Sequence, residues 1–172
     1  MAQMLFICTG NVCRSAYAER EAARIVPGDA GWEFASAGVA ALAGRPMDQL
    51  MADELAARGG DPAGFVARQI DRGIIGDADL IVGMEAYHRQ VVLDDHPALV
   101  RRTFTLGQLA GIVQGFPELS GADLVEAVGA RRHRVRDEDD IADPYRRGPQ
   151  PAAHAAAQIS DLLDQILPRL TA

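Results

Sequence analysis

The chain has 172 residues, of which 48% are hydrophobic and 24% are charged, a size and composition that fit one globular domain with a buried core. Its 24 acidic and 17 basic side chains give a net charge of -7, which argues against a protein that mainly binds nucleic acid or an anionic membrane. No apolar stretch is long enough to cross a bilayer, and the run from Met4 to Ile7 has no basic segment before it. We therefore expect a cytoplasmic protein whose two cysteines are free thiols.

Apolar runs and helical periodicity alternate along the first two thirds of the chain. In chain order they predict a strand at Met4–Ile7, a helix from Arg14, a strand at Trp32–Ser36, a helix over Met47–Gly60, a strand at Ala78–Met84, a helix from Glu85 and a weaker strand within Arg101–Leu106. This alternation predicts an α/β fold, a single-domain doubly wound sheet of about four parallel strands with helices on both faces. Ligands of such sheets bind at the carboxyl ends of the strands.

The pattern is weaker from about residue 108 to residue 140. Two short helical stretches are broken at Gly115–Gly121, and a dense run of mixed charge, "RHRVRDEDD", follows them. We interpret this segment as a helical or irregular insertion in a single domain that spans residues 1–172. The chain closes with "PAAHAAAQISDLLDQILPRL", whose apolar spacing predicts a terminal helix packed on the sheet.

The segment "CTGNVCRS" joins the first predicted strand to the first predicted helix. If this loop curls into a nest, its backbone N–H groups and the positive end of the helix converge on one anion, such as phosphate. The residues of this phosphate-binding loop are Thr9, Gly10, Asn11, Val12, Cys13 and Arg14. A cysteine aimed into such a ring favours its thiolate, so Cys8 is the expected nucleophile. A lone cysteine at a strand end is more often a buried structural residue, but the whole string Cys-x5-Arg-Ser favours a function.

Three further side chains fit the same chemistry. Arg14 can hold two phosphate oxygens through its planar fork, and Ser15 can donate a hydrogen bond to the thiolate when phosphate leaves. A thiolate that attacks a phosphate ester also needs an acid to protonate the leaving oxygen, and Asp143 in "IADPYRRG" is the candidate. Tyr145 follows it as an aromatic wall for a substrate ring. Asp-Pro turns are common in loops, so the weight of this motif comes from its pairing with the cysteine loop.

These two motifs together resemble the low-molecular-weight protein tyrosine phosphatase family, which has a Cys-x5-Arg-Ser loop near its N-terminus and Asp-Pro-Tyr near its C-terminus. The resemblance extends through "SAG" at 36–38, "GRPMD" at 44–48, "ARQI" at 67–70 and "DADLIVGME" at 77–85. It implies a phosphocysteine intermediate on Cys8, phosphate binding by Arg14 and the loop amides, and acid–base work by Asp143. It also implies a phosphotyrosine protein as substrate, without metal or organic cofactor.

The resemblance extends to the residues that support the loop, and there the chain departs from the family. Asn11 and Ser36 match positions that hold the loop through hydrogen bonds, but Phe65 stands where many members carry a histidine. The network around Asn11 is therefore expected to be thinner or differently built.

The walls of the pocket depart from the family as well. Leu42 is the only sizeable side chain where members usually have an aromatic, so an aliphatic wall replaces a stacking partner. Arg146, followed by Arg147, replaces a second aromatic after Asp143. Two cations beside the pocket could favour an acidic peptide or a second phosphate, and solvated surface arginines are the alternative.

The sequence leaves alternatives open for Cys13, for the overall activity and for the histidines. Cys13 is either a packing residue or a redox partner that traps oxidised Cys8 in a disulfide. A phosphate- or phosphopeptide-binding module with weakened catalysis is the alternative to a phosphatase; an arsenate reductase is disfavoured because no downstream cysteine pair follows. The four histidines have no metal-ligand spacing and are interpreted as surface or helix-packing residues; they are His88, His96, His133 and His154.

Overall fold

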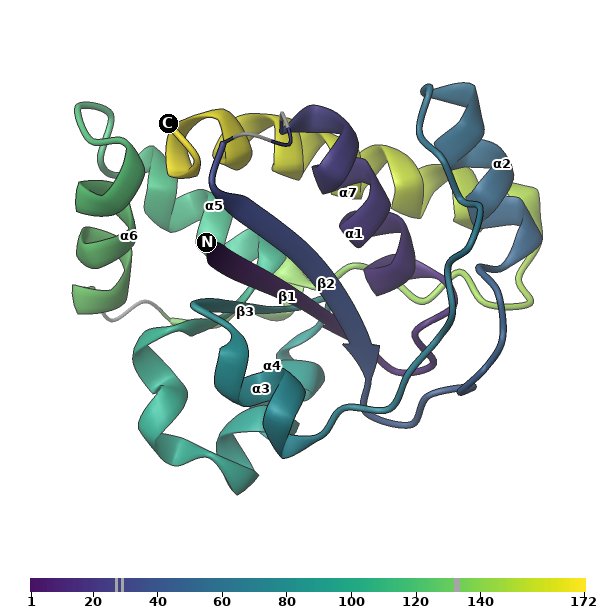
Figure 1. Cartoon of the computed structure of the whole chain (residues 1–172), viewed down its shortest axis with the longest axis horizontal. Coiled ribbons are helices and arrows are strands. Elements are labelled where there is room, and N and C mark those ends of the chain that lie inside the picture. The colour runs from purple at the N-terminus through teal and green to yellow at the C-terminus, as the bar shows by residue number, and fades with distance from the viewer. Residues whose placement is uncertain (27, 29, 132–133) are drawn as a thin grey trace.

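The first strand, β1 (Ala2–Cys8), lies in the middle of the sheet (Figure 1). We describe it from a computed structural model that describes every residue except 27, 29, 132 and 133. Residues 4–7 of β1 are fully buried. A continuous apolar run is what a parallel strand covered on both faces requires, because neither side of it meets water.

Three more strands complete the sheet, and all of them run parallel to β1. They are β2 (Trp32–Gly38), β3 (Leu80–Gly83) and β4 (Thr103–Thr105), and the strand order is β2-β1-β3-β4. The register places Cys8 opposite Gly38 and Ile7 opposite Gly83, so the carboxyl ends of three strands meet at one edge of the sheet. The predicted four-stranded parallel sheet of a single α/β domain is confirmed.

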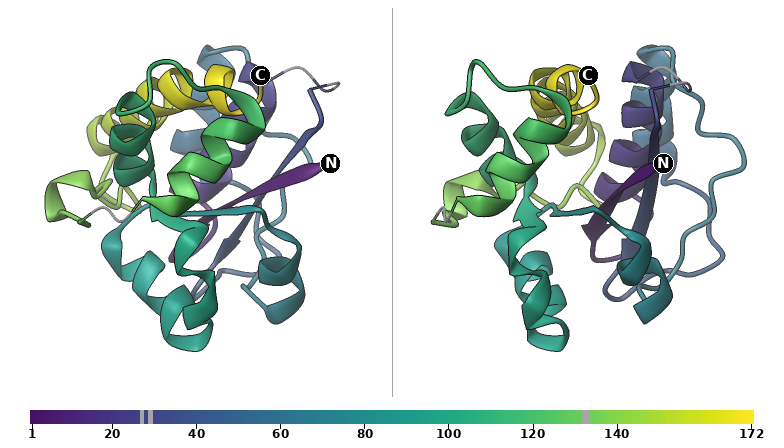
Figure 2. Two further views of the ribbon diagram at one scale, coloured as in Figure 1. Left: turned by 90° about the vertical axis from the view of Figure 1, so that its left-hand side faces the viewer. Right: turned by 60° about the vertical axis from the view of Figure 1, so that its left-hand side comes forward.

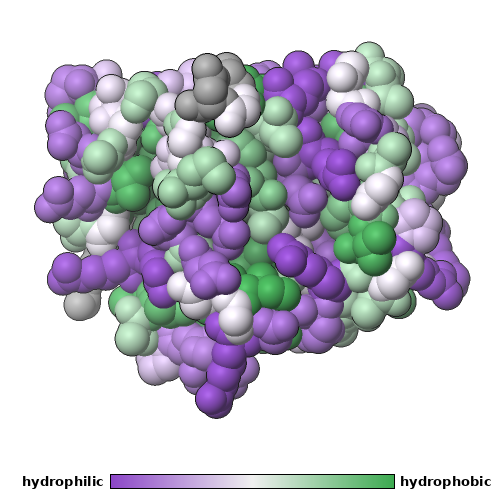
Figure 3. Space-filling view, viewed as in Figure 1, coloured by the Kyte–Doolittle hydropathy of each residue, from purple (hydrophilic) through white to green (hydrophobic). Residues whose placement is uncertain are grey.

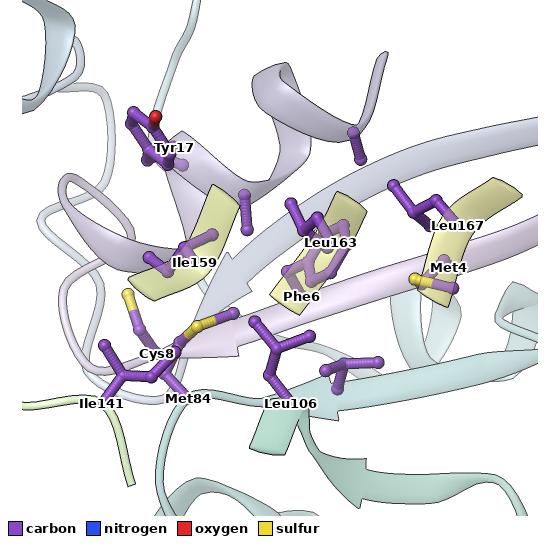
Figure 4. Close-up of a cluster of buried hydrophobic side chains, with 14 of the residues drawn as sticks. Met4, Phe6, Cys8, Tyr17, Met84, Leu106, Ile141, Ile159, Leu163 and Leu167 are labelled. Carbon is purple, nitrogen blue, oxygen red and sulfur yellow. The ribbon is translucent and has the colours of Figure 1, made fainter. Parts of the chain in front are cut away.

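Helices cover both faces of the sheet, as predicted (Figures 1 and 2). On one face, α1 (Arg14–Ile25), α5 (Leu106–Gln114) and α7 (Pro149–Leu170) share the larger core, and α2 (Gln49–Ala57) packs against α1 and α7. Figure 4 shows this core, in which Met4 and Phe6 of β1 lie beside Leu163 and Leu167 of α7.

The other face carries the shorter helices α3 (Arg72–Asp77) and α4 (Ala86–Asp95). Leu5 and Ile7 of β1 point to this side and form a smaller core with Ile75 and Val92. The alternation of neighbouring side chains between two cores follows from the two-residue period of a strand. A 3-10 turn, η1 (Pro97–Arg101), connects α4 to β4.

The segment 108–140 packs on the domain with two helices. α5 ends at Gln114, α6 (Gly121–Ala130) follows, and a 3-10 turn, η2 (Asp137–Asp139), precedes the last loop. Leu124 and Val128 of α6 are buried in the larger core, and Arg169 of α7 donates to the carbonyls of Phe116, Val113 (2.9 Å) and Leu119 (2.8 Å). That this segment is an insertion remains a prediction.

Two helices differ from the sequence-based expectation. The helix predicted over Met47–Gly60 is shorter, and the short helix α3 was not predicted. α3 has only six residues, too few for a periodic pattern, and it begins where the Asp71 side chain accepts a hydrogen bond from the Ile74 N–H (2.9 Å).

On the face shown in Figure 3, hydrophobic residues lie in separate patches among hydrophilic ones. Among the residues that the structure describes, no helix combines the length and the apolar composition that a bilayer crossing requires.

Candidate active site

The loop between β1 and α1 turns its carbonyl groups outward. The carbonyls of residues 8, 9, 10 and 12 accept backbone hydrogen bonds from Val39, Ala40, Leu42 and Asp48, at 2.8–3.0 Å. In the part of the chain that the structure describes, no backbone N–H of residues 9–15 donates to a protein acceptor. Because N–H and C=O point in opposite directions in a trans peptide, outward carbonyls leave the amides to face the centre of the loop. The loop therefore has the construction of an anion-binding nest.

Asn11 holds the curled shape of this loop. Its φ of 54° lies in the left-handed region, which asparagine tolerates better than most residues. Its side-chain amide donates to Ser15 Oγ (2.9 Å) and Ser36 Oγ (2.8 Å), while its Oδ1 accepts from the Arg68 backbone N–H (2.8 Å). Asn11, Ser15 and Ser36 are all buried, so they lie behind the loop rather than in its opening.

Gly38 allows the loop to lie directly against the end of β2. A Cβ atom at this position would be 2.5 Å from the Thr9 carbonyl oxygen and 3.0 Å from the Asn11 nitrogen. Any larger residue would displace the loop, which gives a physical reason for the glycine of the "SAG" segment.

Cys8 lies at the end of β1, beside Met84 and Ile141 (Figure 4). Its Sγ is 2.9 Å from Ser15 Oγ. Because Ser15 Oγ already accepts a hydrogen bond from Asn11, its own proton is free to be donated to the sulfur. This arrangement points one hydrogen-bond donor at the Cys8 sulfur.

The Arg14 guanidinium is buried, and only part of it is engaged. Nη1 donates to the Ile141 carbonyl (2.6 Å) and forms an ion pair with Glu85 Oε1, while Nη2 is 3.7 Å from Asp143 Oδ2. Nε has no hydrogen-bond partner among the described residues. An unsatisfied buried donor is costly, and the edge formed by Nε and Nη2 matches two oxygens of a phosphate.

His88 is buried and contacts the loop from α4, so its interpretation as a surface or helix-packing residue is wrong. Its Nδ1 accepts the Glu85 backbone N–H (3.0 Å), so Nε2 carries the proton and donates to Thr9 Oγ1 (3.0 Å). Burial and the nearby Arg14 charge lower the pKa of His88 to about 4, so the ring is neutral at pH 7. The spacing of Glu85 and His88 at the start of a helix is a capping pattern, the one signal that would have found this pair.

The second loop of the site, residues 142–147, carries Asp143. The Asp143 side chain is 50% exposed, and its Oδ1 accepts the Tyr145 N–H (3.1 Å). Arg146 has a φ of 57°, and its guanidinium lies 5.2 Å above the centre of the Tyr145 ring. Just before this loop, the Ile141 N–H donates to the Met84 carbonyl (2.9 Å).

The two loops enclose a cavity of about 140 Å³. Its lining comprises Cys8, Thr9, Gly10, Val12, Cys13, Arg14, Ala40, Leu42, Asp143 and Tyr145. The structure thus brings the predicted nucleophile, arginine, acid and both predicted walls around one opening.

The support behind the loop is built differently from the histidine arrangement of many family members. Ser36 Oγ donates to Glu19 Oε2 (2.7 Å), and Glu19 lies 3.4 Å from Arg20 Nε. Burial raises the pKa of Glu19. Phe65 is buried, with the Arg20 guanidinium 5.7 Å from its ring centre. A carboxylate on α1 therefore ends the hydrogen-bond chain that starts at Asn11.

Cys13 is buried in the same loop, and both cysteines are free thiols. Burial raises the pKa of Cys13, and the negative charges of Asp48, Cys8 and Asp143 raise it further. Cys13 is thus held as a protonated thiol, which is a much poorer nucleophile than a thiolate.

Within the described ranges, no three His, Cys, Asp or Glu side chains form a group that could hold a metal ion. His96 is half-buried, His154 is exposed, and His133 lies outside the described residues.

Comparisons with known proteins show the family and the fold of the chain. The family model described as low molecular weight phosphotyrosine protein phosphatase matches residues 3–110. The chain is 28% identical to the probable low molecular weight protein-tyrosine-phosphatase EpsP of Ralstonia nicotianae, over 98% of this chain and 96% of that protein.

Two solved structures have the same fold and 25% sequence identity. Wzb of Vibrio vulnificus, in complex with benzylphosphonate, has a TM-score of 0.76 over 98% of this chain and 99% of its own. The YwlE arginine phosphatase of Geobacillus stearothermophilus has a TM-score of 0.75 over 98% and 92%.

Proposed function

Because the chain belongs to the low molecular weight phosphotyrosine protein phosphatase family, we propose that it hydrolyses protein phosphotyrosine and small aryl phosphates through a phosphocysteine on Cys8. The observation that carries this proposal is the cradle of backbone amides and Arg14 around Cys8. Outward carbonyls leave the loop amides to an anion, and Arg14 Nε has no protein partner among the described residues. A tetrahedral oxyanion above the sulfur satisfies both.

The first half of the reaction transfers the phosphoryl group to sulfur. The Cys8 thiolate attacks phosphorus, the bond from phosphorus to the tyrosine oxygen breaks, and Asp143 gives its proton to that oxygen. The amides and Arg14 stabilise the charge that develops on the equatorial oxygens.

The second half returns the enzyme to its starting state. Asp143, now a carboxylate, takes a proton from water as the water attacks phosphorus, and the sulfur–phosphorus bond breaks. Ser15 Oγ, 2.9 Å from the sulfur, stabilises the departing thiolate by donating a hydrogen bond to it.

The walls of the opening favour an aryl ester. Val12, Ala40, Leu42 and Tyr145 are the larger apolar side chains among the residues that line the cavity. An aromatic ring gains from burial against such side chains, and Tyr145 offers a face for stacking. Phosphoarginine carries a guanidinium in place of the ring, so a phosphoarginine peptide is the informative comparison, given the similarity to an arginine phosphatase.

A substrate panel tests the proposal. We expect turnover of an aryl phosphate and a phosphotyrosine peptide, slower turnover of phosphoserine and phosphoarginine peptides, and no thioredoxin-coupled turnover of arsenate. Acid quenching during turnover traps the wild-type protein with one added phosphoryl group, and Cys8→Ser abolishes aryl phosphate hydrolysis. Tight phosphate binding without hydrolysis by the wild type would instead identify a binding module.

Reversible oxidation of Cys8 with Cys13 as a trap is a further part of this proposal. Its support is the presence of both thiols in one loop. The raised pKa of Cys13 makes a fast attack by its thiolate less favourable and gives more weight to packing.

A further inference from the structure

A second cavity of about 280 Å³ adjoins the one over Cys8. The two cavities share Val12, Leu42 and Tyr145 as lining residues. The second is further lined by Arg45, Pro46, Met47, Asp48 and Arg146. When a phosphotyrosine is bound over the phosphate-binding loop, the residues next to it in the substrate peptide can therefore reach the second cavity.

The charge of this second cavity is opposite to that of the protein. Two guanidinium groups and one carboxylate line it, whereas the whole chain carries a net charge of -7. Among the described residues, neither Arg45 nor Arg146 forms a side-chain hydrogen bond or ion pair with a protein acceptor; Arg146 only stacks on Tyr145. Both cations are available to an anion from outside.

The backbone around Arg45 is fixed before any ligand arrives. The Arg45 N–H donates to the Leu42 carbonyl (3.1 Å), the Arg45 carbonyl accepts from Ala67 (2.8 Å), and the Asp48 N–H donates to the Val12 carbonyl (2.8 Å). These hydrogen bonds connect the wall of the second cavity to the phosphate-binding loop. Little backbone entropy is therefore lost when a ligand binds there.

We propose that this cavity binds an anionic side chain next to the phosphotyrosine of the substrate, with Arg45 and Arg146 as the groups that hold it. The inference rests on the proposed phosphatase function and names its substrate class, an acidic phosphotyrosine peptide. A carboxylate and a second phosphate share this chemistry, and the test separates them. Pro46, Met47 and Tyr145 supply apolar contacts for the stem of either side chain.

Steady-state kinetics with three matched peptides tests the proposal. They share one phosphotyrosine, and the adjacent residue is alanine, glutamate, or a side chain with a phosphonate that cannot be hydrolysed. We expect kcat/KM for the wild type to be about five- to tenfold higher with either anionic peptide than with the alanine peptide, since solvent-exposed ion pairs are individually weak. A preference for the phosphonate alone would assign the subsite to a second phosphate.

The double variant Arg45→Gln/Arg146→Asn removes both charges, and asparagine accepts the positive φ at position 146. For this variant we expect the ratio of kcat/KM with an anionic peptide to kcat/KM with the alanine peptide to fall to about one. Arg147→Gln is the matched control, because Arg147 is exposed and lines neither cavity, and it should keep the wild-type ratio.

Added salt gives a second measurement that needs no variant, and the wild-type ratio should fall as ionic strength rises. Equal kcat/KM values for the three peptides in a wild type that hydrolyses an aryl phosphate would overturn the subsite alone. A double variant that keeps the wild-type ratio would do the same. A wild type that hydrolyses neither aryl phosphate nor peptide would overturn the proposed function as well.

Discussion

The two loops that form the site are held to different degrees. In the loop of residues 8–15, Asn11, Arg14 and Ser15 are buried, and each has its side chain in defined hydrogen bonds or ion pairs. In the loop of residues 142–147, half of the Asp143 side-chain surface is exposed, and its carboxylate has one backbone hydrogen bond, from Tyr145, and one long ion pair, with Arg14 (3.7 Å). A group that stabilises charge works best when fixed in advance, whereas a proton donor must also reach water. In the proposed reaction, this difference separates anion binding by the first loop from proton transfer by the second.

The largest loss of activity should come from a substitution of Arg14 in the loop of residues 8–15. Arg14→Lys keeps one charge but loses the fork, so we expect kcat/KM for an aryl phosphate to fall about 10³-fold. Steady-state kinetics and phosphate binding by calorimetry measure it. A variant within threefold of the wild type would show that the fork is not needed.

Asp143→Asn, in the more exposed loop, should lower the activity less than Arg14→Lys does. Asparagine can still accept the Tyr145 N–H but cannot donate an acidic proton, so we expect kcat for a phosphotyrosine peptide to fall about 10²- to 10³-fold. The loss should be smaller for a nitrophenyl ester, whose leaving oxygen needs less protonation. An equal loss with both substrates would argue against Asp143 as the acid.

Ser36→Ala tests how far the fixed loop depends on its support. It removes the acceptor for Asn11 and the donor to Glu19, and one such hydrogen bond is worth about 1 kcal/mol, so we expect kcat to fall about threefold to tenfold. Ser120→Ala is the control, because Ser120 is exposed and makes no capping bond with its side chain. A kcat unchanged by both substitutions would refute this support role.

The smallest effect concerns the pH dependence of stability through His88. Its folded pKa, about 4, is below the unfolded value of 6.5, so the unfolded chain binds more protons between these values. The contribution of the neutral ring is complete above pH 6.5 and is lost as pH falls toward 4. We expect the Tm of the wild type to drop more between pH 7 and pH 5 than that of His88→Asn. Parallel curves would show that the contact with Thr9 has no such dependence.

The sequence was most informative where chemistry and local structure coincide. "LFICTGNVCRS" predicts a buried strand, a curled loop and a helix, because each step needs only neighbouring residues. Glu85 and His88 escaped prediction because they belong to the start of another helix. Only the pairing of Ile7 with Gly83 brings that helix start beside the loop.

The same limit applies to the rest of the site. Glu19 reads as one more polar residue of an amphipathic helix, and Arg45 as one more loop cation. Their roles depend on which side chains from distant segments approach them. No spacing within the sequence encodes the distance from Glu19 to Ser36.

The backbone N–H and C=O of Ile141 both form hydrogen bonds, and they fix the start of the loop of residues 142–147. Its N–H donates to the carbonyl of Met84, the residue after β3, and its carbonyl accepts from Arg14. Both bonds come from the backbone of residue 141, so the register between Asp143 and the Cys8 sulfur depends on the path of the chain here and not on the isoleucine side chain. A conservative apolar substitution at position 141 should therefore leave that register unchanged, whereas a deletion or insertion between residues 141 and 143 would shift it.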